Sequence, residues 1–321
     1  MDKIIVKKAD KNILKELQSI GFDKTYIETA KQKYTGEAYK IFNLKPYEAN
    51  ILKQICLSLG FDCAVSRDTV TCKCETTNCL IFATELQYKK LIEKLKEQPF
   101  NLKIVSEKLN KAINYCLEPL QIGNSYFDWK RPYIMGILNT TPDSFSDGGC
   151  FNDVQSAFEH CQKLIDDGAD IIDIGGESTR PNAKTITTEE EITRVIPVIE
   201  KIRKNNIDIP ISIDTRNYQT AKQALEAGAD IINDVSGLDY DNNLFEYVTQ
   251  NNIPVIIMHS DKVPAVSNNF SSGDIAEEIY ISLENKINKL INCGLQRKNI
   301  ILDVGIGFGK SQTANIELLR R

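Results

Sequence analysis

The chain has 321 residues, a formal net charge of −5 at pH 7 and 26% charged residues. These values are typical of a globular protein with one or two domains, and the negative charge argues against a nucleic-acid or anionic-membrane partner. No apolar run approaches the ~20 residues that a membrane-spanning helix needs, and the first residues lack the apolar core of a signal peptide. We therefore expect a cytoplasmic protein whose nine cysteines are reduced thiols.

Residues 1–120 are predicted to form a small α+β domain, and residues 121–132 a linker. Apolar residues follow helical spacing at 12–20, 46–59 and 85–95, whereas 63–74 and 80–84 have strand-like sequences. Pro119, Gly123 and Pro132 interrupt these patterns at the predicted junction. This first domain contains no recognisable arrangement of site residues, so its role is not predicted.

The densest cysteine cluster lies in the first domain and consists of Cys72, Cys74 and Cys79. Zinc sites need four ligands and usually use CxxC pairs, whereas the first pair here has CxC spacing. Val70, Cys72 and Cys74 alternate with polar residues, which is typical of a half-buried strand. We therefore expect a structural strand in preference to a metal site.

From Tyr133 onward, short apolar runs alternate with helical stretches, which predicts repeated βα units. The expected strands are 133–138, 170–174, 210–213, 230–233, 254–258 and 299–302. The expected helices are 154–167, 189–204, 218–227, 243–251, 275–292 and one that begins at 315. Such a pattern indicates a doubly wound sheet or a (β/α)8 barrel, and no GxGxxG follows the first strand to support a dinucleotide-binding sheet.

Two helix-to-strand junctions are nearly identical. They read Gly168-Ala-Asp-Ile-Ile-Asp173 and Gly228-Ala-Asp-Ile-Ile-Asn233. In each, a glycine at the helix end suits the left-handed backbone that commonly ends helices. The apolar residues that follow suit a strand buried on both faces of a parallel sheet.

Every expected strand is followed by polar or ionisable residues. In chain order these are Asn139, Gly175–Pro181, Asp214–Arg216, Asn233–Asp234, Met258–His259 and the loop Asp303–Lys310. Any one of them could be an ordinary cap or turn residue. Because the carboxyl ends of parallel strands meet at one edge, however, their repetition predicts a shared site there.

The sequence from Tyr133 to Gly149, YIMGILNTTPDSFSDGG, closely resembles the first signature of the dihydropteroate synthase family, and the resemblance continues to Arg321. It implies a TIM barrel of the pterin-binding type. The implied enzyme is a folate-pathway transferase that condenses 6-hydroxymethyl-7,8-dihydropterin diphosphate with p-aminobenzoate, giving 7,8-dihydropteroate and diphosphate. The expected substrates are thus small molecules, and a homodimer is among the assemblies that the resemblance allows.

Only about six βα units precede the end of the sequence, whereas a TIM barrel has eight. Family members place a lysine and a serine at the seventh strand and an arginine and a histidine at the eighth. None of these has a counterpart here. We therefore expect a fragment of a longer protein in preference to a defective gene product.

The resemblance also implies how the pterin and the metal are bound. Asp214, Asn233 and Asp303 match the residues that hold the pterin, whose pyrimidine edge suits carboxylates and an amide. Asn139 matches the family asparagine associated with magnesium and diphosphate. Mg²⁺ prefers oxygen ligands and often takes only one or two from the protein, so a single amide oxygen is adequate.

Two loops are expected to complete the site. By resemblance, Thr179 and Pro181 line the p-aminobenzoate site, and Arg180 contacts the diphosphate through its planar donor group. Asp147 lies near the developing pterin cation, and Phe145 shields the site from water. An ordinary surface loop is the alternative for this last pair, although an apolar side chain in a polar segment argues against it.

The glycine-rich segment after Asp303 is not a phosphate-binding P-loop, because Val304 stands where that motif requires glycine. The family resemblance instead implies a tight turn in which Phe308 packs against the p-aminobenzoate ring. Lys310 is a further candidate, although a solvated or aspartate-paired lysine explains it equally well.

The expected catalytic residues are Asp147, Arg180 and Asp303. Arg180 and Mg²⁺ would neutralise charge on the departing diphosphate, while Asp303, Asp214 and Asp147 favour the electron-poor pterin methylene. Two alternatives remain open at this point. One is a pterin-binding methyltransferase domain, which would not explain the Asn139–Gly149 segment, and the other is an inactive pterin-binding protein.

Overall fold

The computed structural model describes residues 12–140, 149–177, 185–260 and 274–321. The chain divides into two compact units, Met1–Cys116 and Leu117–Arg321. The boundary thus lies close to the predicted end of the first domain at residue 120. The segment 121–132, expected to be a linker, belongs instead to the second unit.

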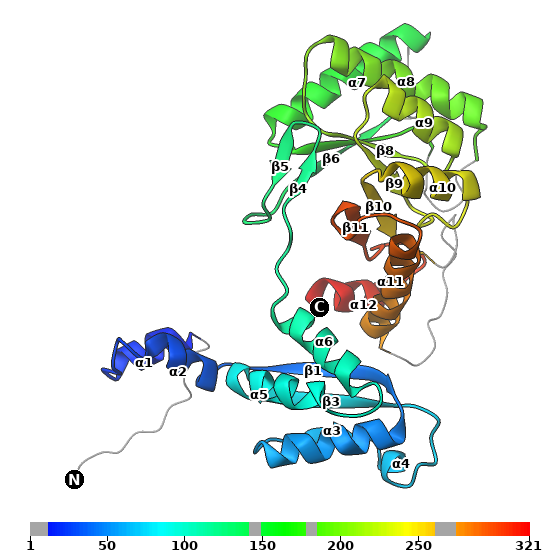
Figure 1. Cartoon of the computed structure of the whole chain (residues 1–321). Helices are drawn as coiled ribbons and strands as arrows, with labels where there is room; N and C mark the ends of the chain where they lie inside the picture. Colours follow the sequence, from blue (N-terminus) through cyan, green and yellow to red (C-terminus); the bar gives the residue numbers. More distant parts are fainter. Residues whose placement is uncertain (1–11, 141–148, 178–184, 261–273) are drawn as a thin grey trace. The chain divides into compact units, whose positions relative to one another are not determined.

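The first unit is a three-stranded antiparallel sheet with helices on one face (Figure 1). Its strands are β1 (Gly36–Leu44), β2 (Cys63–Val65) and β3 (Thr77–Thr84), in the order β1-β3-β2. Its helices are α1 (Ile13–Ser19), α2 (Ile27–Tyr34), α3 (Pro46–Ser58), α4 (Arg67–Val70), α5 (Glu85–Lys96) and α6 (Leu102–Ile113). The predicted small α+β domain is therefore present.

Strand β3 shows how this sheet is covered. Its side chains point alternately to the two faces, so Cys79 and Ile81 are buried while Leu80 and Phe82 are 48% and 64% exposed. The buried face packs against helices α3 and α5, with residues such as Leu52 in the shared core. One face of the sheet therefore supplies the core of this unit.

The predicted strand through Cys72 and Cys74 is wrong. Residues 67–70 form the short helix α4 instead, capped by Ser66, whose Oγ accepts from the Asp68 backbone N–H. Cys72 and Cys74 lie in the turn that follows, and Cys72 has a φ of +52°. Local side-chain-to-backbone bonds of this kind compete with strand pairing, which explains why alternation alone misled.

The second unit is built on a six-stranded parallel sheet in the order β11-β10-β9-β8-β7-β6 (Figure 1). The strands are β6 (Met135–Asn139), β7 (Ile171–Gly175), β8 (Ile211–Asp214), β9 (Ile231–Asp234), β10 (Val255–Met258) and β11 (Ile300–Asp303). The helices are α7 (Gly149–Asp166), α8 (Thr188–Lys204), α9 (Tyr218–Ala227), α10 (Asn242–Asn251), α11 (Ile275–Asn292), the 3₁₀ helix η2 (Arg297–Asn299) and α12 (Gln312–Arg320). Every predicted strand and helix of this unit is thus present, close to its expected bounds.

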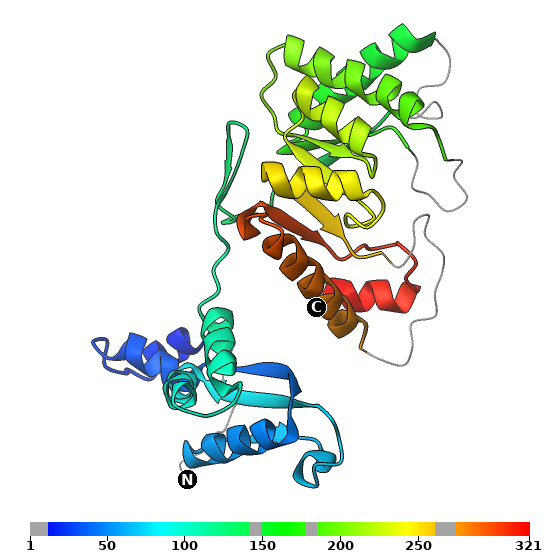
Figure 2. The same cartoon turned by 45° about the vertical axis from the view of Figure 1, so that its right-hand side comes forward.

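Neighbouring strands of this sheet are also neighbours in the sequence, as in a (β/α)8 barrel. The predicted α/β fold with about six βα units is therefore confirmed. Within the described residues the sheet does not close, because β6 and β11 are its two edges (Figure 2). No described helix combines the length and apolarity that crossing a bilayer requires.

The outer face of this sheet forms the main hydrophobic core with the helices. Ile174, Ile213 and Ile257 on the strands are fully buried against side chains such as Val195 and Ile199 of α8. A strand that is buried on its outer face in this way needs an apolar residue at every second position.

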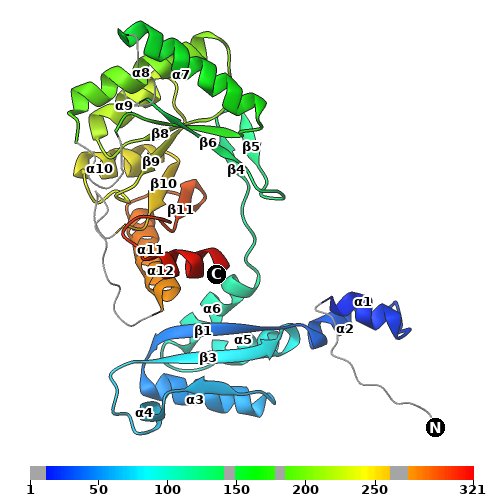
Figure 3. The ribbon, with the colours of Figure 1, turned by 180° about the vertical axis from the view of Figure 1, so that it is seen from behind.

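The inner face is closed at the amino end of the strands by a hairpin of β4 (Leu120–Ile122) and β5 (Ser125–Phe127), seen in Figure 3. Leu120, Ile122 and Phe127 form a separate cluster with Ile171 and Ile231, which begin β7 and β9. The hairpin therefore supplies a second, smaller core at the end of the sheet opposite to the strand termini that are rich in polar residues.

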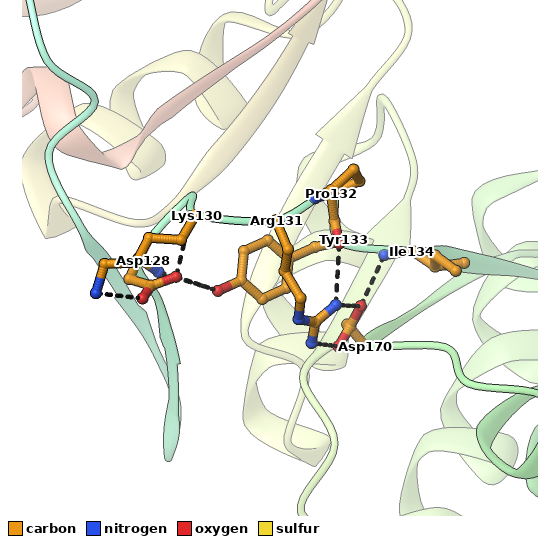
Figure 4. Close-up of polar contacts among 7 residues, drawn as sticks. All are labelled: Asp128, Lys130, Arg131, Pro132, Tyr133, Ile134 and Asp170. Carbon is orange, nitrogen blue, oxygen red and sulfur yellow. Dashed lines mark hydrogen bonds and ion pairs between the residues drawn. The ribbon is translucent and has the colours of Figure 1, made fainter.

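Polar contacts fix the hairpin to the sheet, which explains why 121–132 is not a linker (Figure 4). Arg131 forms two hydrogen bonds with the Asp170 carboxylate, at 3.0 and 2.5 Å, and this carboxylate also accepts from the Ile134 N–H at 2.8 Å. The Tyr133 hydroxyl donates to Asp128 at 2.8 Å. Backbone and side-chain hydrogen bonds hold the pKa of Asp128 at about 2.

Gly168 and Gly228 have φ values of +101° and +112°, as expected for glycines that end helices. At Gly228 a second constraint applies, because a Cβ would lie 2.9 Å from Arg203 Cγ. The Arg203 guanidinium donates to the Gly228 carbonyl at 2.9 Å and to Asp230 at 2.8 Å. Through these contacts, Arg203 of α8 fixes the junction between α9 and β9.

Candidate functional site

Two predicted site residues meet above Gly175, the last residue of β7. Asn139 ends β6 and Asp214 ends β8, and both are in register with Gly175. A Cβ built on Gly175 would lie 3.8 Å from Asn139 Oδ1 and 3.4 Å from Asp214 Oδ2. The amide and the carboxylate therefore converge on one point, and glycine leaves the space between them open.

Asn233, the register partner of Asp214 on β9, is held by a residue that the sequence analysis did not select. Its Nδ2 donates to Asp173 Oδ2 at 3.1 Å. Asp173 lies in the middle of β7 and is 7% exposed, next to the fully buried Ser212 of β8. Asp173 Oδ1 and Ser212 Oγ make no hydrogen bond within the described residues. These two side chains form a deeper polar layer below the strand ends.

Asp173 could have been found from the repeated junction. It occupies the position that Asn233 occupies in the second copy of the repeat, and Asn233 was selected. In addition, every residue of β7 is buried, and a carboxylate in such a strand is costly unless something offsets it.

The site concentrates carboxylates, and this changes their proton affinities. Burial raises the pKa of Asp214 well above its usual value, and the nearby charge of Asp173 raises it further. Burial also raises the pKa of Asp173, and the charge of Asp303 acts in the same direction, against the hydrogen bond from Asn233. Such a site is suited to a ligand that brings N–H donors or positive charge.

Asp303 ends β11 and is exposed, and its Oδ1 accepts from the Gly305 N–H at 2.7 Å. Its negative charge acts to raise the pKa of Asp173. Gly305 has a φ of +69°, and a Cβ there would lie 2.3 Å from the His259 carbonyl oxygen. Only glycine therefore lets this loop pass the end of β10 so closely. Phe308, later in the loop, is half-buried.

Lys310 is buried and bonded to the backbone, unlike the solvated lysine that was one alternative for it. It is 8% exposed, and its ammonium donates to the backbone carbonyls of His259, Gly305 and Phe308 at 3.2, 2.8 and 3.2 Å. Its burial rules out a solvated lysine. Instead it ties the loop after β11 to the end of β10.

A second set of contacts missed by the sequence analysis joins the ends of β7 and β8. Arg216 lies 3.2 Å from the carboxylate of Glu177, and both side chains are largely buried. The Arg216 guanidinium carbon also lies 4.4 Å from the centre of the Tyr240 ring. Arg216 and Glu177 both lie in the strand-end segments quoted above, but their residue types alone did not indicate that they pair.

The remaining predicted residues lie outside the described residues. They are Phe145, Asp147, Thr179, Arg180 and Pro181. Of the predicted residues, the structure brings Asn139 and Asp214 together, joins Asn233 to the additional residue Asp173, and places Asp303 at the end of β11.

Three comparisons with known proteins bear on this site. Residues 135–321 match the family described as pterin binding enzyme. The chain is 44% identical over 217 residues to a dihydropteroate synthase from Synechocystis sp., a match that covers 67% of this chain and 75% of that one. A solved structure of Xanthomonas albilineans dihydropteroate synthase with 4-aminobenzoic acid is 37% identical, with a TM-score of 0.58, and the match covers 63% of this chain and 72% of that one.

A further match concerns the first unit. The chain is 38% identical over 275 residues to a probable bifunctional folylpolyglutamate synthase/dihydropteroate synthase from Halobacterium salinarum. This match covers 85% of the present chain and 33% of that protein. Because residues 117–321 make up a smaller share of the chain than this, the similarity extends into the first unit.

Proposed function

The chain belongs to the pterin-binding enzyme family, and on that premise we propose that it is a dihydropteroate synthase, a transferase of folate biosynthesis. Its substrates are 6-hydroxymethyl-7,8-dihydropterin diphosphate and p-aminobenzoate, and its products are 7,8-dihydropteroate and diphosphate. The observation that supports this most directly is the convergence of Asn139, Asp214 and Asn233 at adjoining strand ends.

In this mechanism the pterin is bound by its N–H-rich pyrimidine edge. Asp214, Asn233 and Asp303 are the proposed partners, because carboxylates accept paired N–H donors and an amide can complement them. Donors from the ligand favour the ionised form of Asp214, and so they offset the burial that otherwise raises its pKa.

The reaction breaks the bond between the pterin methylene carbon and the diphosphate oxygen, and diphosphate leaves with the electron pair. The lone pair of the p-aminobenzoate nitrogen forms the new C–N bond, and a proton leaves that nitrogen. Negative charge from Asp214 and Asp303 favours the electron-poor methylene that develops on the way. Preorganised carboxylates of this kind act without reorganisation during the reaction.

Magnesium is proposed as the cofactor, with Asn139 as its protein ligand. Asn139 Oδ1 is an oxygen donor on an exposed side chain, and it faces the same open point as Asp214 Oδ2. Mg²⁺ often takes most of its ligands from phosphate and water, so a single protein oxygen is adequate. Bound Mg²⁺ would neutralise charge on the diphosphate.

Further roles are proposed for residues of the two loops and of the segment after β11. Arg180 contacts the diphosphate, and Asp147 lies near the pterin cation. The p-aminobenzoate site is lined by Phe145, Thr179, Pro181 and Phe308. We also propose a cytoplasmic location, which agrees with free thiols at the described cysteines. A homodimer remains a prediction, and light scattering would test it.

The test is to incubate the purified protein with both substrates and Mg²⁺, and to follow 7,8-dihydropteroate by chromatography. Formation of this product above that of an Asp214→Asn control supports the proposal. A second candidate is pterin binding without turnover. Calorimetry with the pterin diphosphate separates these outcomes, and absence of both turnover and binding would refute the proposed function.

A further inference from the structure

A side-chain amide can bind a ligand in two ways, because it has an acceptor oxygen at one end and a donor nitrogen at the other. Which end faces a ligand depends on what holds the other end. At Asn233, the carboxylate of Asp173 holds the nitrogen end, because Asn233 Nδ2 donates to Asp173 Oδ2 at 3.1 Å. This contact joins the middle of β7 to the end of β9, across β8.

Asp173 is well placed to fix this orientation. An ionised carboxylate has no hydrogen to donate, so it pairs with the NH₂ end of Asn233 and not with the oxygen. The side chain is 7% exposed on a strand whose residues are all buried, which leaves it little freedom to turn away.

A purely structural role explains Asp173 poorly. Its Oδ1 has no hydrogen-bond partner within the described residues, and its pKa is raised by burial. A buried carboxylate that is half satisfied destabilises the fold in comparison with an apolar residue of similar size. Its presence is therefore better explained by what it does for Asn233.

We propose that Asp173 is a positioning residue of the pterin site, which engages Asn233 Nδ2 and so leaves Asn233 Oδ1 to accept a hydrogen bond from the pterin ring. The proposal rests on the proposed function, because it concerns how the same site distinguishes a ring that offers N–H donors from one that offers carbonyl oxygens. Asp173 does not touch the ligand in this arrangement.

The key variant is Asp173→Asn, which has the same shape but can donate as well as accept. Its new NH₂ group can pair with Asn233 Oδ1, and Asn233 then turns its own NH₂ toward the ligand. The reciprocal double variant, Asp173→Asn with Asn233→Asp, reverses the direction of the bond between 173 and 233 and restores an acceptor that faces the ligand at 233. Ser212→Ala is the matched control, because Ser212 lies beside Asp173 in the same buried layer.

The measurement is isothermal titration of each protein with 6-hydroxymethylpterin and with 6-hydroxymethyl-lumazine, in which a carbonyl replaces the 2-amino group. We expect Asp173→Asn to lose about tenfold to hundredfold in pterin affinity, with a smaller loss for the lumazine. The double variant should recover most of the preference for pterin, and Ser212→Ala should keep it. In turnover, the KM for the pterin diphosphate should rise while the KM for p-aminobenzoate stays unchanged.

The possible results test the proposed function and the role of Asp173 separately. If the unaltered protein binds no pterin, the proposed function fails and this inference fails with it. If it binds pterin and Asp173→Asn keeps both the affinity and the preference, only the inference is overturned. Thermal unfolding checks that each variant is folded. Should Asp173→Asn not fold, the double variant decides, since a folded double variant without pterin preference also overturns the inference.

Discussion

The two faces of the six-stranded sheet differ sharply, although the same strands form both. On the outer face, residues such as Ile174 and Ile213 are completely buried beneath helices. On the inner face, the neighbouring residues Asp173, Ser212 and Asp214 are polar, and both carboxylates have raised pKa values. A single step along the chain therefore separates a residue that stabilises the sheet from one that serves the site.

This difference follows from the period of two in a β-strand. It also means that the inner face is free to keep groups that cost stability, because the outer face supplies the apolar burial. Changes on the outer face should alter folding and leave the selectivity of the site intact. Changes of the ligand-binding side chains on the inner face should do the reverse, and four predictions test this separation from the largest expected effect to the smallest.

The largest effect is expected for Ile213→Ala on the outer face. Ile213 is fully buried, so losing its side chain removes apolar contacts and leaves a cavity, at a cost of about 2–5 kcal/mol in the free energy of unfolding. Urea denaturation would measure it. The inner-face neighbour Ser212→Ala should change this free energy by less than about 1 kcal/mol, because its hydroxyl makes no hydrogen bond within the described residues. Equal losses in both variants would contradict the separation.

The next largest effect is expected for Asp214→Asn, and it should appear in binding. Replacing one partner of a charge-assisted contact costs about 1.5–3 kcal/mol, so pterin diphosphate affinity should fall about tenfold to hundredfold. The free energy of unfolding should not fall, because the carboxylate is already disfavoured by its surroundings. Calorimetry and denaturation on the same samples test both statements, and unchanged affinity would remove Asp214 from the site.

The third effect is a dependence of stability on pH. The folded protein raises the pKa of Asp214, so it binds this proton more tightly than the unfolded chain, where the value is about 3.9. The contribution of Asp214 to the free energy of unfolding is therefore fully present below about pH 3.9, and it is lost as the pH rises toward the pKa of the folded state. Relative to the unaltered protein, Asp214→Asn should gain stability between pH 4 and pH 7. Denaturation curves of both proteins at pH 4 and pH 7 measure this gain. If the idea is wrong, the difference in unfolding free energy between the two proteins will be the same at both pH values.

The smallest effect concerns magnesium. Asn139→Ala should raise the Mg²⁺ concentration needed for half-maximal turnover by a few-fold, because one oxygen ligand is lost while phosphate and water still supply the others. Stability should be unaffected, since Asn139 is exposed at the end of β6. A titration of activity after chelation provides the measurement. Full activity without any added divalent ion would rule out the metal role.

The sequence predicted the second unit far better than the first. Each of its strands is a short apolar run between helices of regular spacing, so periodicity and local breakers agree. In the first unit, β1, α2 and α6 were not predicted, and in β1 the apolar residues come in adjacent pairs and do not alternate with polar ones. At Cys72 the alternation was real, but a helix cap and a turn determined the local structure.

The candidate site was predictable where residue type and strand end coincide. Asn139, Asp214, Asn233 and Asp303 follow this rule, and family resemblance identified the same positions. Asp173 does not follow it, because it lies inside a strand and its importance depends on a contact across another strand. Such a diagonal contact depends on strand register, which no local pattern in the sequence specifies.

The hairpin at the amino end of the sheet has a consequence for the order of folding during synthesis. Leu120, Ile122 and Phe127 leave the ribosome before any strand of the sheet, yet the residues that bury them include Ile231 and Ile256, more than a hundred positions later. Contacts so distant in sequence form slowly. Part of the apolar surface of the hairpin therefore stays exposed until β9 and β10 have been synthesised.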